Sequence, residues 1–386
     1  MPSVFQGAPK REATPEIQAS IMPPQKRKNA EAEVDDPREA TSTKKQKNQS
    51  SEARSEKVGS NSTKGILSLP SELWTETLKN LQAIGPLTRA PSDTPVLPET
   101  YLERTDTLRA LSQVCVAYRR AFLPVLWESF TACCSARVSA KTKSGSFYKH
   151  NGEALLRKCA GFTANSELAG FVREAHVILT RYQAATLIPN FSAALGKLPN
   201  LHTLHVLHAH TAMTTALKTG FEGVTLPQIR TLIIPGNGHE ILRSCPHVLT
   251  VRCTSEDGSK LITVIGKHCP DVQEMHGFCT EESYMKRMVK AAPNLRVFEI
   301  STYNPENVVQ FLPRFKKINT VIIRTPRSRE DKQAAALQAC IRTVVKGLKD
   351  LPPSTEERRV RLWHDDWETR QSESGGFFTE VDLGQA

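Results

Sequence analysis

The sequence predicts a mixed α/β fold in which a small helical module precedes an irregular solenoid of short strands and helices, closed by a C-terminal capping helix. Two short amphipathic helices are expected between residues 66 and 130. An apolar spacing typical of strands that open a repeat unit recurs between residues 171 and 325. A further helical face spans residues 330–348, where apolar residues recur at helical intervals.

The composition is that of a soluble protein with some disordered sequence. Apolar residues make up 39% of the 386 residues, charged residues 24% and aromatic residues 6%. No apolar run approaches the roughly 18 residues that cross a bilayer, and the N-terminus lacks the apolar core of a signal peptide. The nine cysteines include no CxxC pair, so we expect them to be reduced and mostly buried. The sequence therefore predicts a protein of the nucleus, the cytoplasm or both, with no membrane partner.

The formal net charge of +11 raises the question of a nucleic-acid partner, because clustered Lys and Arg release counterions from phosphates. Residues 1–65 contain 12 basic and 9 acidic residues, which leaves +8 for the rest of the chain. This remaining charge is spread thinly along the sequence, with no dominant basic stripe. Nucleic acid is therefore not an expected partner.

Residues 1–65 are rich in Pro, Ser, Thr, Asn, Lys and Glu and contain few large apolar residues, so we expect a disordered basic tail. Two basic clusters in this tail resemble a bipartite nuclear-import sequence, and they comprise Lys26, Arg27, Lys28, Lys44, Lys45 and Lys47. An ordinary solvated tail accounts for the same residues equally well.

Residues 66–130 predict a module of two short helices. Pro70 suits the first turn of a helix, and apolar residues then recur at helical spacing until Gly85 and Pro86 end it. Neither helix can bury its apolar face alone, so the two must pack on each other, on the following array or on a partner.

The connection between these helices, residues 85–106, contains four prolines and predicts an exposed loop. Asp106 is expected to cap the second helix, whose apolar face continues until Pro124 ends it.

Three fragments of this module resemble the F-box of many fungal proteins. They are residues 69–73 (LPSEL), 108–119 (LRALSQVCVAYR) and 123–127 (LPVLW). The resemblance implies a helical unit that docks on the Skp adaptor subunit of a Skp-Cullin-F-box ubiquitin ligase, and through it on a cullin. The residues that would bind the adaptor are Leu69, Pro70, Leu73, Leu108, Leu111, Val114, Cys115, Tyr118, Leu126 and Trp127. The loop of residues 85–106 is longer than the usual turn of the family.

Beyond a helical linker expected over residues 131–170, the spacing Φ-x-x-Φ-x-Φ, with Φ apolar, recurs seven times at intervals of 19 to 29 residues. The triplets are Val172/Ala175/Val177, Leu201/Leu204/Val206, Ile229/Leu232/Ile234, Val248/Val251/Cys253, Val272/Met275/Gly277, Leu295/Phe298/Ile300 and Ile318/Val321/Ile323. Ala175 and Gly277 fit poorly. The pattern resembles the leucine-rich repeats often found behind F-boxes. The Asn or Cys expected after the third position occurs only as Asn237, so we expect an irregular, weakly curved solenoid over residues 171–325.

In such a solenoid the residue between the second and third apolar positions points away from the core. That row reads His176, His205, Ile233, Arg252, His276, Glu299 and Ile322. We interpret its polar members His176, His205, Arg252, His276 and Glu299 as the surface that binds a substrate protein. A merely solvated sheet face explains the row equally well. Metal binding is not expected, because the three histidines are not consecutive in the row.

Residues 326–365 predict a capping helix and an extension, and residues 366–386 a flexible tail. No P-loop, dinucleotide fingerprint, nucleophile elbow or HExxH helix occurs, so no catalytic residue, metal or cofactor is predicted. The sequence therefore favours a substrate-recognition adaptor of a Skp-Cullin-F-box ligase that is not an enzyme. A nuclear scaffold, or a protein weakly associated with nucleic acid and without a ligase role, stays open as the alternative.

Overall fold

The computed structural model describes residues 69–85, 97, 99–134, 144–255, 258–302, 305–325, 331–353, 357–364 and 377–382. The chain divides into two compact units, Met1–Asn61 and Ser62–Ala386, and every described residue belongs to the second. The predicted disordered tail and its import residues therefore lie outside the described residues. Among the described residues, no helix combines the length and the apolarity needed to span a bilayer.

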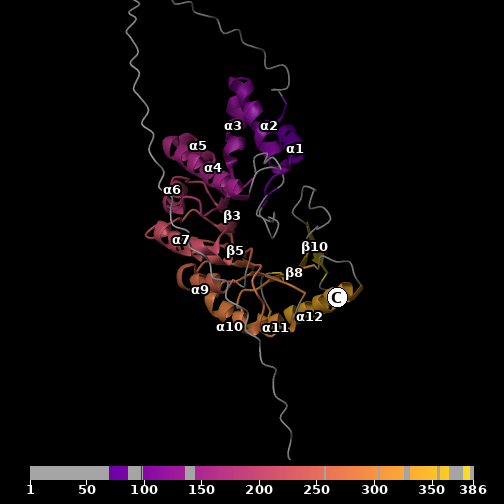
Figure 1. Ribbon diagram of the computed structural model, residues 1–386. Coiled ribbons are helices and arrows are strands. Elements are labelled where there is room, and N and C mark those ends of the chain that lie inside the picture. The colour runs from indigo at the N-terminus through magenta and orange to yellow at the C-terminus, as the bar shows by residue number, and fades with distance from the viewer. Residues whose placement is uncertain are drawn as a thin grey trace, which may run out of the picture. The chain divides into compact units, whose positions relative to one another are not determined.

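The second unit is a mixed α/β fold whose described residues form one open sheet of ten strands. The strands lie side by side in chain order, and neighbours are parallel except β9 and β10, which are antiparallel (Figure 1). Their bounds are β1 (Ser129–Ala132), β2 (Glu174–Leu179), β3 (Thr203–Ala209), β4 (Thr231–Ile234), β5 (Thr250–Cys253), β6 (Glu274–His276), β7 (Val297–Ile300), β8 (Thr320–Arg324), β9 (Arg359–His364) and β10 (Phe377–Val381). The seven segments with the repeating apolar spacing form β2 to β8.

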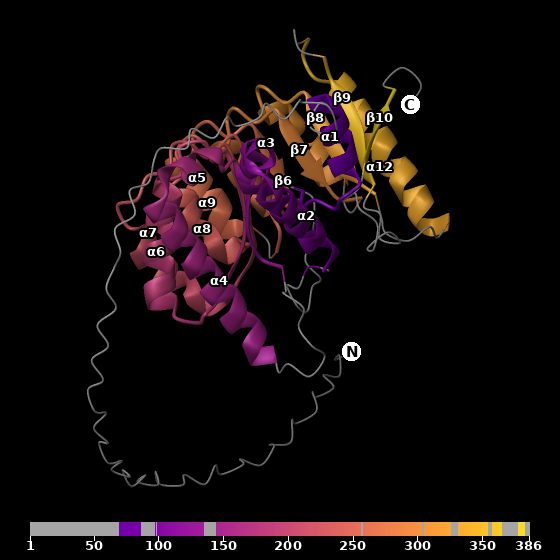
Figure 2. The ribbon, with the colours of Figure 1, turned by 90° about the horizontal axis from the view of Figure 1, so that it is seen from above.

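Helices occupy the connections between parallel strands, because such strands cannot be joined by a tight turn. They are α4 (Ser144–Ala164), α5 (Ser166–Phe171), α6 (Ala184–Gly196), α7 (Thr214–Phe221), α8 (His239–Arg243), α9 (Ser259–His268), α10 (Glu282–Ala291), α11 (Pro305–Val309) and α12 (Asp331–Lys349). Short 3-10 turns precede α7 and α8 and follow α11, namely η2 (Thr211–Met213), η3 (Gly236–Gly238) and η4 (Leu312–Arg314). Figure 2 shows α6 to α9 side by side along one face of the sheet.

The main core lies between the sheet and these helices. The second apolar position of each predicted triplet, and the corresponding residue of β9, is fully buried and in register with its neighbours across the sheet. These residues are Ala175, Leu204, Leu232, Val251, Met275, Phe298, Val321 and Val360. Each side chain removed from water stabilises the fold by about 1.5 to 3 kcal/mol when it is large and aliphatic or aromatic. Seven of the nine cysteines are also buried, as the composition predicts.

The first three helices, α1 (Ser71–Lys79), α2 (Thr100–Val114) and α3 (Val116–Glu128), pack around a separate small core. Leu78, Leu108, Tyr118 and Phe122 form its buried centre. The Trp74 ring meets the Phe122 ring edge-to-face, with 4.9 Å between ring centroids. We call α1 to α3 the three-helix module.

The helix boundaries in this module differ from the sequence prediction. Asp106 does not cap a helix, because α2 already begins at Thr100. The chain then breaks at Cys115, whose backbone is extended and whose Sγ accepts a hydrogen bond from the Tyr118 amide (3.5 Å), so Cys115 caps a third helix. Pro124 lies inside α3 and does not end it, since the residues that follow still pack into the small core.

The connection between α1 and α2 is not wholly exposed, contrary to expectation. Leu97 is 1% exposed and packs with Ile84, Cys133 and Ile178 in a second small cluster, which Phe147 of α4 also joins. Half-buried Tyr101 and Leu102 from the first turn of α2 join this cluster. Apolar residues in the proline-rich segment therefore bind the sheet and not the small core of the three-helix module.

Two helices and three strands extend the α/β fold beyond the predicted range of residues 171–325. Residues 131–170 are more than a linker, because α4 and α5 belong to the main core and β1 pairs with β2. The α12 helix forms as predicted and buries Ile341, Val344 and Leu348, yet β9 and β10 follow it. The described part of the predicted flexible tail, Phe377–Val381, forms strand β10.

Candidate functional site

The predicted substrate-binding row lies on the sheet face opposite the main core. Strand register aligns Thr131, His176, His205, Ile233, Arg252 and His276 across six neighbouring strands. Farther along the sheet, Glu299 aligns with Ile322, and Ile322 aligns with Arg361. The sequence pattern therefore predicts correctly which residues share this row.

The row is nevertheless buried, which corrects the expectation of an open surface. His176 is 0% exposed, His205 2%, Arg252 9%, His276 6% and Glu299 2%. These side chains pair with one another and with polar neighbours on the same face, as the following contacts show. The predicted residues therefore form a buried polar layer, and a partner would first meet the side chains around them.

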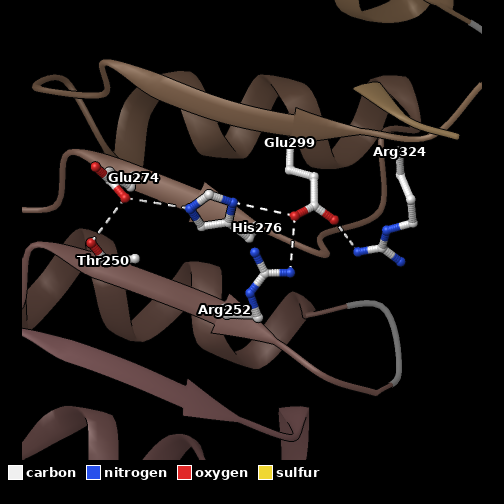
Figure 3. Close-up of polar contacts among 6 residues, drawn as sticks. All are labelled: Thr250, Arg252, Glu274, His276, Glu299 and Arg324. Carbon is white, nitrogen blue, oxygen red and sulfur yellow. Dashed lines mark hydrogen bonds and ion pairs between the residues drawn. The ribbon is translucent and has the colours of Figure 1, made fainter. Parts of the chain in front are cut away.

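Glu299 is the centre of the larger polar cluster on this face (Figure 3). Its Oε2 accepts from the Arg252 guanidinium at 2.9 Å and lies 3.3 Å from Nδ1 of His276, while its Oε1 accepts from Arg324. The other ring nitrogen of His276, Nε2, lies 3.5 Å from Oε2 of Glu274. The imidazole thus bridges two carboxylates on adjacent strands.

These contacts keep both carboxylates ionised. Burial alone would raise the pKa of Glu299, but the His276 hydrogen bond and the charges of Arg252 and Arg324 outweigh it and hold that pKa well below its usual range. The pKa of Glu274 is lowered by the hydrogen bond from His276, against burial. Because the pKa values of both carboxyl groups are lowered by folding, the two groups stabilise the fold fully at neutral pH. This stabilisation is lost as the pH falls below about 4.5, where the unfolded chain binds the protons more readily.

A smaller cluster joins Glu174, His176 and His205 on β2 and β3. The Nδ1 atoms of the two histidines lie 3.4 Å apart, and Nε2 of His176 lies 3.3 Å from Oε2 of Glu174. Burial, with further contributions from His176 and Arg252, lowers the pKa of His205 to about 3. His205 is therefore neutral in the folded protein at any pH near neutrality.

We expect His205 to make the protein less stable as the pH falls from about 6.5 towards 3. In this range the unfolded chain binds a proton on His205 that the folded chain excludes, so the slope is at most about 1.4 kcal/mol per pH unit. Urea unfolding of wild type and His205→Gln between pH 6 and 5 measures the difference in slope. The control His247→Gln changes a half-exposed histidine beside Asp271. Equal slopes for wild type and His205→Gln would contradict the prediction.

A cavity of about 510 Å³ lies next to the Glu299 cluster, and residues on or just before the strands from β6 to β10 line it. It is lined by Glu274, His276, Val297, Asn319, Thr320, Ile322, Glu357, Arg359, Arg361 and Phe378. Arg361 binds Glu380 at 2.8 Å and Arg359 binds Glu357 at 2.6 Å, and both carboxylates are largely exposed. Such surface pairs stabilise the fold by less than about 1 kcal/mol each. A ligand carboxylate can therefore replace Glu380 on Arg361, or Glu357 on Arg359, at little cost.

Sequence reasoning identified His276 in this cavity but missed its β9 and β10 walls. The eighth repeat places Val360 and Leu362 at the second and third apolar positions, but Glu357 stands at the first, so the triplet is broken. At the other end of the sheet, Trp127, Phe130 and Ala132 do fit the spacing and lead into β1. Trp127 and Phe130 lie in the predicted helical module and Ala132 in the predicted linker of residues 131–170, so this triplet is not among the seven predicted ones.

The predicted adaptor-binding residues separate into an exposed and a buried group. Leu69 (40% exposed), Leu73 (51%) and Val114 (65%) are open to solvent, and so are Pro70 and Cys115. Leu108 and Tyr118 are buried in the small core, and half-buried Leu111 and Leu126 pack against it. Trp127 packs on the main core and meets Phe162 edge-to-face at 5.4 Å.

The exposed residues lie at one end of the three-helix module. At the other end, the C-terminal part of α1 meets the first half of α2, where Arg104 donates to the Leu78 carbonyl (2.7 Å). The α1 helix therefore runs antiparallel to α2, and its start lies near the α2–α3 junction, as the contact between Trp74 and Tyr118 shows. We define the apolar patch as the four exposed residues at this end, Leu69, Leu73, Val114 and Val116.

The described residues contain no group of three His, Cys, Asp or Glu side chains placed to hold a metal ion. A scan against protein-family models finds no match to this chain, and neither does a search of curated proteins.

Proposed function

We propose that this protein is a substrate-recognition adaptor of a Skp-Cullin-F-box ubiquitin ligase, in which the three-helix module binds the Skp subunit and the sheet face binds a target protein. The observation that carries the proposal is the apolar patch. It combines residues of the F-box-like fragments 69–73 and 108–119, and it lies open although fragment 108–119 also supplies Leu108 and Tyr118 to the buried core of the module.

The patch is unusual for the surface of this protein. Among the described residues, five large apolar side chains are exposed, and four of them belong to the patch. Clustered apolar exposure on a soluble domain is typical of a surface that binds another protein. Burying these four side chains against an apolar partner surface would contribute several kcal/mol to association.

In this proposal the strand and helix units behind the module are irregular leucine-rich repeats. The regular strand register and the helix in each connection support that interpretation. The cavity beside Glu299 is the proposed target site, because its apolar wall of Val297, Ile322 and Phe378 lies beside exchangeable arginine pairs. A target segment with an apolar side chain next to a carboxylate suits this lining. The protein would act as an adaptor in the nucleus or the cytoplasm and would have no catalytic role itself.

We expect Leu73→Glu together with Val116→Glu to abolish binding to the Skp subunit. Both residues lie in the first turn of a helix, α1 and α3, where a carboxylate stabilises the helix dipole, so the fold should be retained. Each substitution removes apolar contact and brings a charge into the interface. The loss should reach about 3 kcal/mol or more, over a hundredfold in Kd. Calorimetry with purified Skp subunit measures it.

The matched control is Phe378→Glu, which places the same charge at the exposed apolar residue outside the module. This variant should bind the Skp subunit as wild type does. Circular dichroism establishes that all three proteins are folded. If folded wild-type protein does not bind the Skp subunit, or if the double variant binds unchanged, the adaptor proposal is wrong.

A further inference from the structure

The fold gathers basic residues along one edge of the sheet. In each repeat the chain leaves a helix, turns and starts the next strand at this edge. The backbone joins the residues just before the strands in a continuous ladder, in which the carbonyls of Arg173, His202, Arg230, Gln273 and Arg296 accept from the next strand start. We define the basic edge as the last helical turn before each strand from β2 to β9, together with the turn residues that follow it.

Fourteen Lys and Arg side chains that are not buried lie on the described part of this edge, against four acidic ones, a net charge of +10. The acidic residues are Glu222, Asp271, Asp350 and Glu357. Residues 66–386 carry only +8 in total, so the edge holds more positive charge than the whole of that region. Because one to three basic residues precede each of these strands, the charge is dispersed along the sequence and becomes concentrated only in the fold.

The opposite edge of the sheet carries a different charge. It consists of the residues that follow each of these strands, up to and including the first turn of the next helix. Among the side chains that the structure describes there, two are basic (Arg181 and Lys260) and four are acidic (Glu240, Glu281, Glu282 and Glu306). Surface charge on the repeats is therefore polarised towards the basic edge.

Helix dipoles explain only part of this polarity. Seven of the fourteen cations lie in the last turn of a helix, where the negative dipole end favours them. The other seven lie beyond the last helical residue, although Lys197 is the C-cap of α6 and Arg358 donates to the Leu348 carbonyl at the end of α12. They are Arg173, Lys197, Arg230, Arg296, Lys316, Lys317 and Arg358. Arg230 and Arg358 donate to backbone carbonyls and Lys317 donates to Asn294 Oδ1, and these neutral acceptors leave the positive charge in place for an anionic partner.

The length and charge density of the edge select the kind of partner. From β2 to β9 the sheet makes seven strand-to-strand steps, or roughly 34 Å at about 4.8 Å each. The net charge of +10 over this length is about one charge per 3.4 Å. Duplex DNA carries one phosphate charge per about 1.7 Å of axis and can supply this density with the phosphates of one side, whereas an extended peptide at about 3.3 Å per residue matches it only if every residue is acidic. None of the exposed large apolar side chains of the described residues lies on the edge, so it offers neither a stacking platform for single strands nor an anchor for a lipid surface.

We infer that the basic edge binds the phosphate backbone of a nucleic-acid duplex without sequence preference. This surface is separate from the apolar patch and meets the cavity only at Asn319 and Glu357, so it adds a partner to the proposed adaptor function and does not depend on it. Roughly ten base pairs would lie along the edge, since the duplex rises about 3.4 Å per pair.

Fluorescence anisotropy with the full chain and a labelled DNA duplex of about 20 base pairs tests the inference. The edge variant replaces Lys267, Lys290, Lys316 and Lys317 by Gln. Each lost phosphate contact reduces the slope of log Kd against log salt by about 0.9, so the slope should become shallower by roughly 3 to 4. At about 0.1 M salt the affinity should fall at least tenfold.

The matched control removes the same charge elsewhere, through Lys149→Gln, Arg157→Gln, Arg181→Gln and Lys260→Gln, and should keep wild-type affinity. A tail variant, Lys44→Gln, Lys45→Gln and Lys47→Gln, should also keep it. The inference is overturned if the control or the tail variant weakens binding as much as the edge variant. It is also overturned if poly-glutamate of equal total charge competes as well as unlabelled duplex, because the partner would then be an acidic protein segment.

Discussion

Replacing Glu299 by Ala should destabilise the protein by about 3 to 5 kcal/mol at pH 7. The carboxylate is 2% exposed and neutralises Arg252, which is itself only 9% exposed. Without it, the buried guanidinium keeps only the weaker electrostatic attraction of Glu274, and Arg324 and His276 also lose an acceptor. Removing one partner of a buried ion pair is costly because the remaining charge has left water without compensation.

Urea unfolding measures this loss as a shift in midpoint at an unchanged m value. The control Glu380→Ala removes the exposed carboxylate that binds Arg361, and it should cost less than about 1 kcal/mol. Replacing Arg252 by Met and Glu299 by Leu together should recover most of the stability, since apolar residues of similar size can substitute for a buried pair. A loss below 1 kcal/mol for Glu299→Ala would show that the carboxylate does not compensate the buried arginine.

The strand order of the sheet is predictable from the sequence because each repeat buries its apolar residues at the same spacing. Leu204, Leu232 and Val251 illustrate this, since each lies at the second apolar position and all three align across β3, β4 and β5. The α12 helix is predictable for the same reason, namely a periodic face that must be buried. Local spacing thus determines which residues face the core.

What spacing cannot predict is how side chains on the other face interact. His205 and Glu299 were expected to meet solvent because a strand's outer side is polar by default. Their neighbours on adjacent strands are complementary in charge or hydrogen bonding, so they pair and exclude water instead. Complementarity across strands depends on register, and the register becomes known only when the strands are placed side by side.

The basic edge escapes sequence analysis for a related reason. Lys267, Lys290 and Lys316 are more than 20 residues apart in sequence, and no sequence window reveals them as a cluster. They come together because each one marks the same point of a repeat, the turn into the next strand. A count of charges by position within the repeat could have found the edge.

The misfit of Gly277 to the apolar spacing has a structural cause, which leads to a second large effect. Gly277 follows β6 with φ of +71°, a left-handed conformation that residues with a side chain adopt at a cost of about 1 to 2 kcal/mol. A Cβ atom there would lie 2.2 Å from the backbone carbonyl oxygen of Cys253. Because that oxygen belongs to β5, relief requires a strand to move. We therefore expect Gly277→Ala to lower the free energy of unfolding by about 2 to 5 kcal/mol.

The matched substitution is Gly161→Ala in α4, where no atom lies within 4 Å of the added Cβ. Alanine favours the helix there, so this variant should be more stable than wild type by about 1 kcal/mol. Thermal and urea unfolding of both variants separates the two effects of the same added methyl group. If Gly277→Ala is as stable as wild type, the close approach of β6 to β5 at Cys253 is wrong, and with it the alignment that brings Arg252 and His276 together on Glu299.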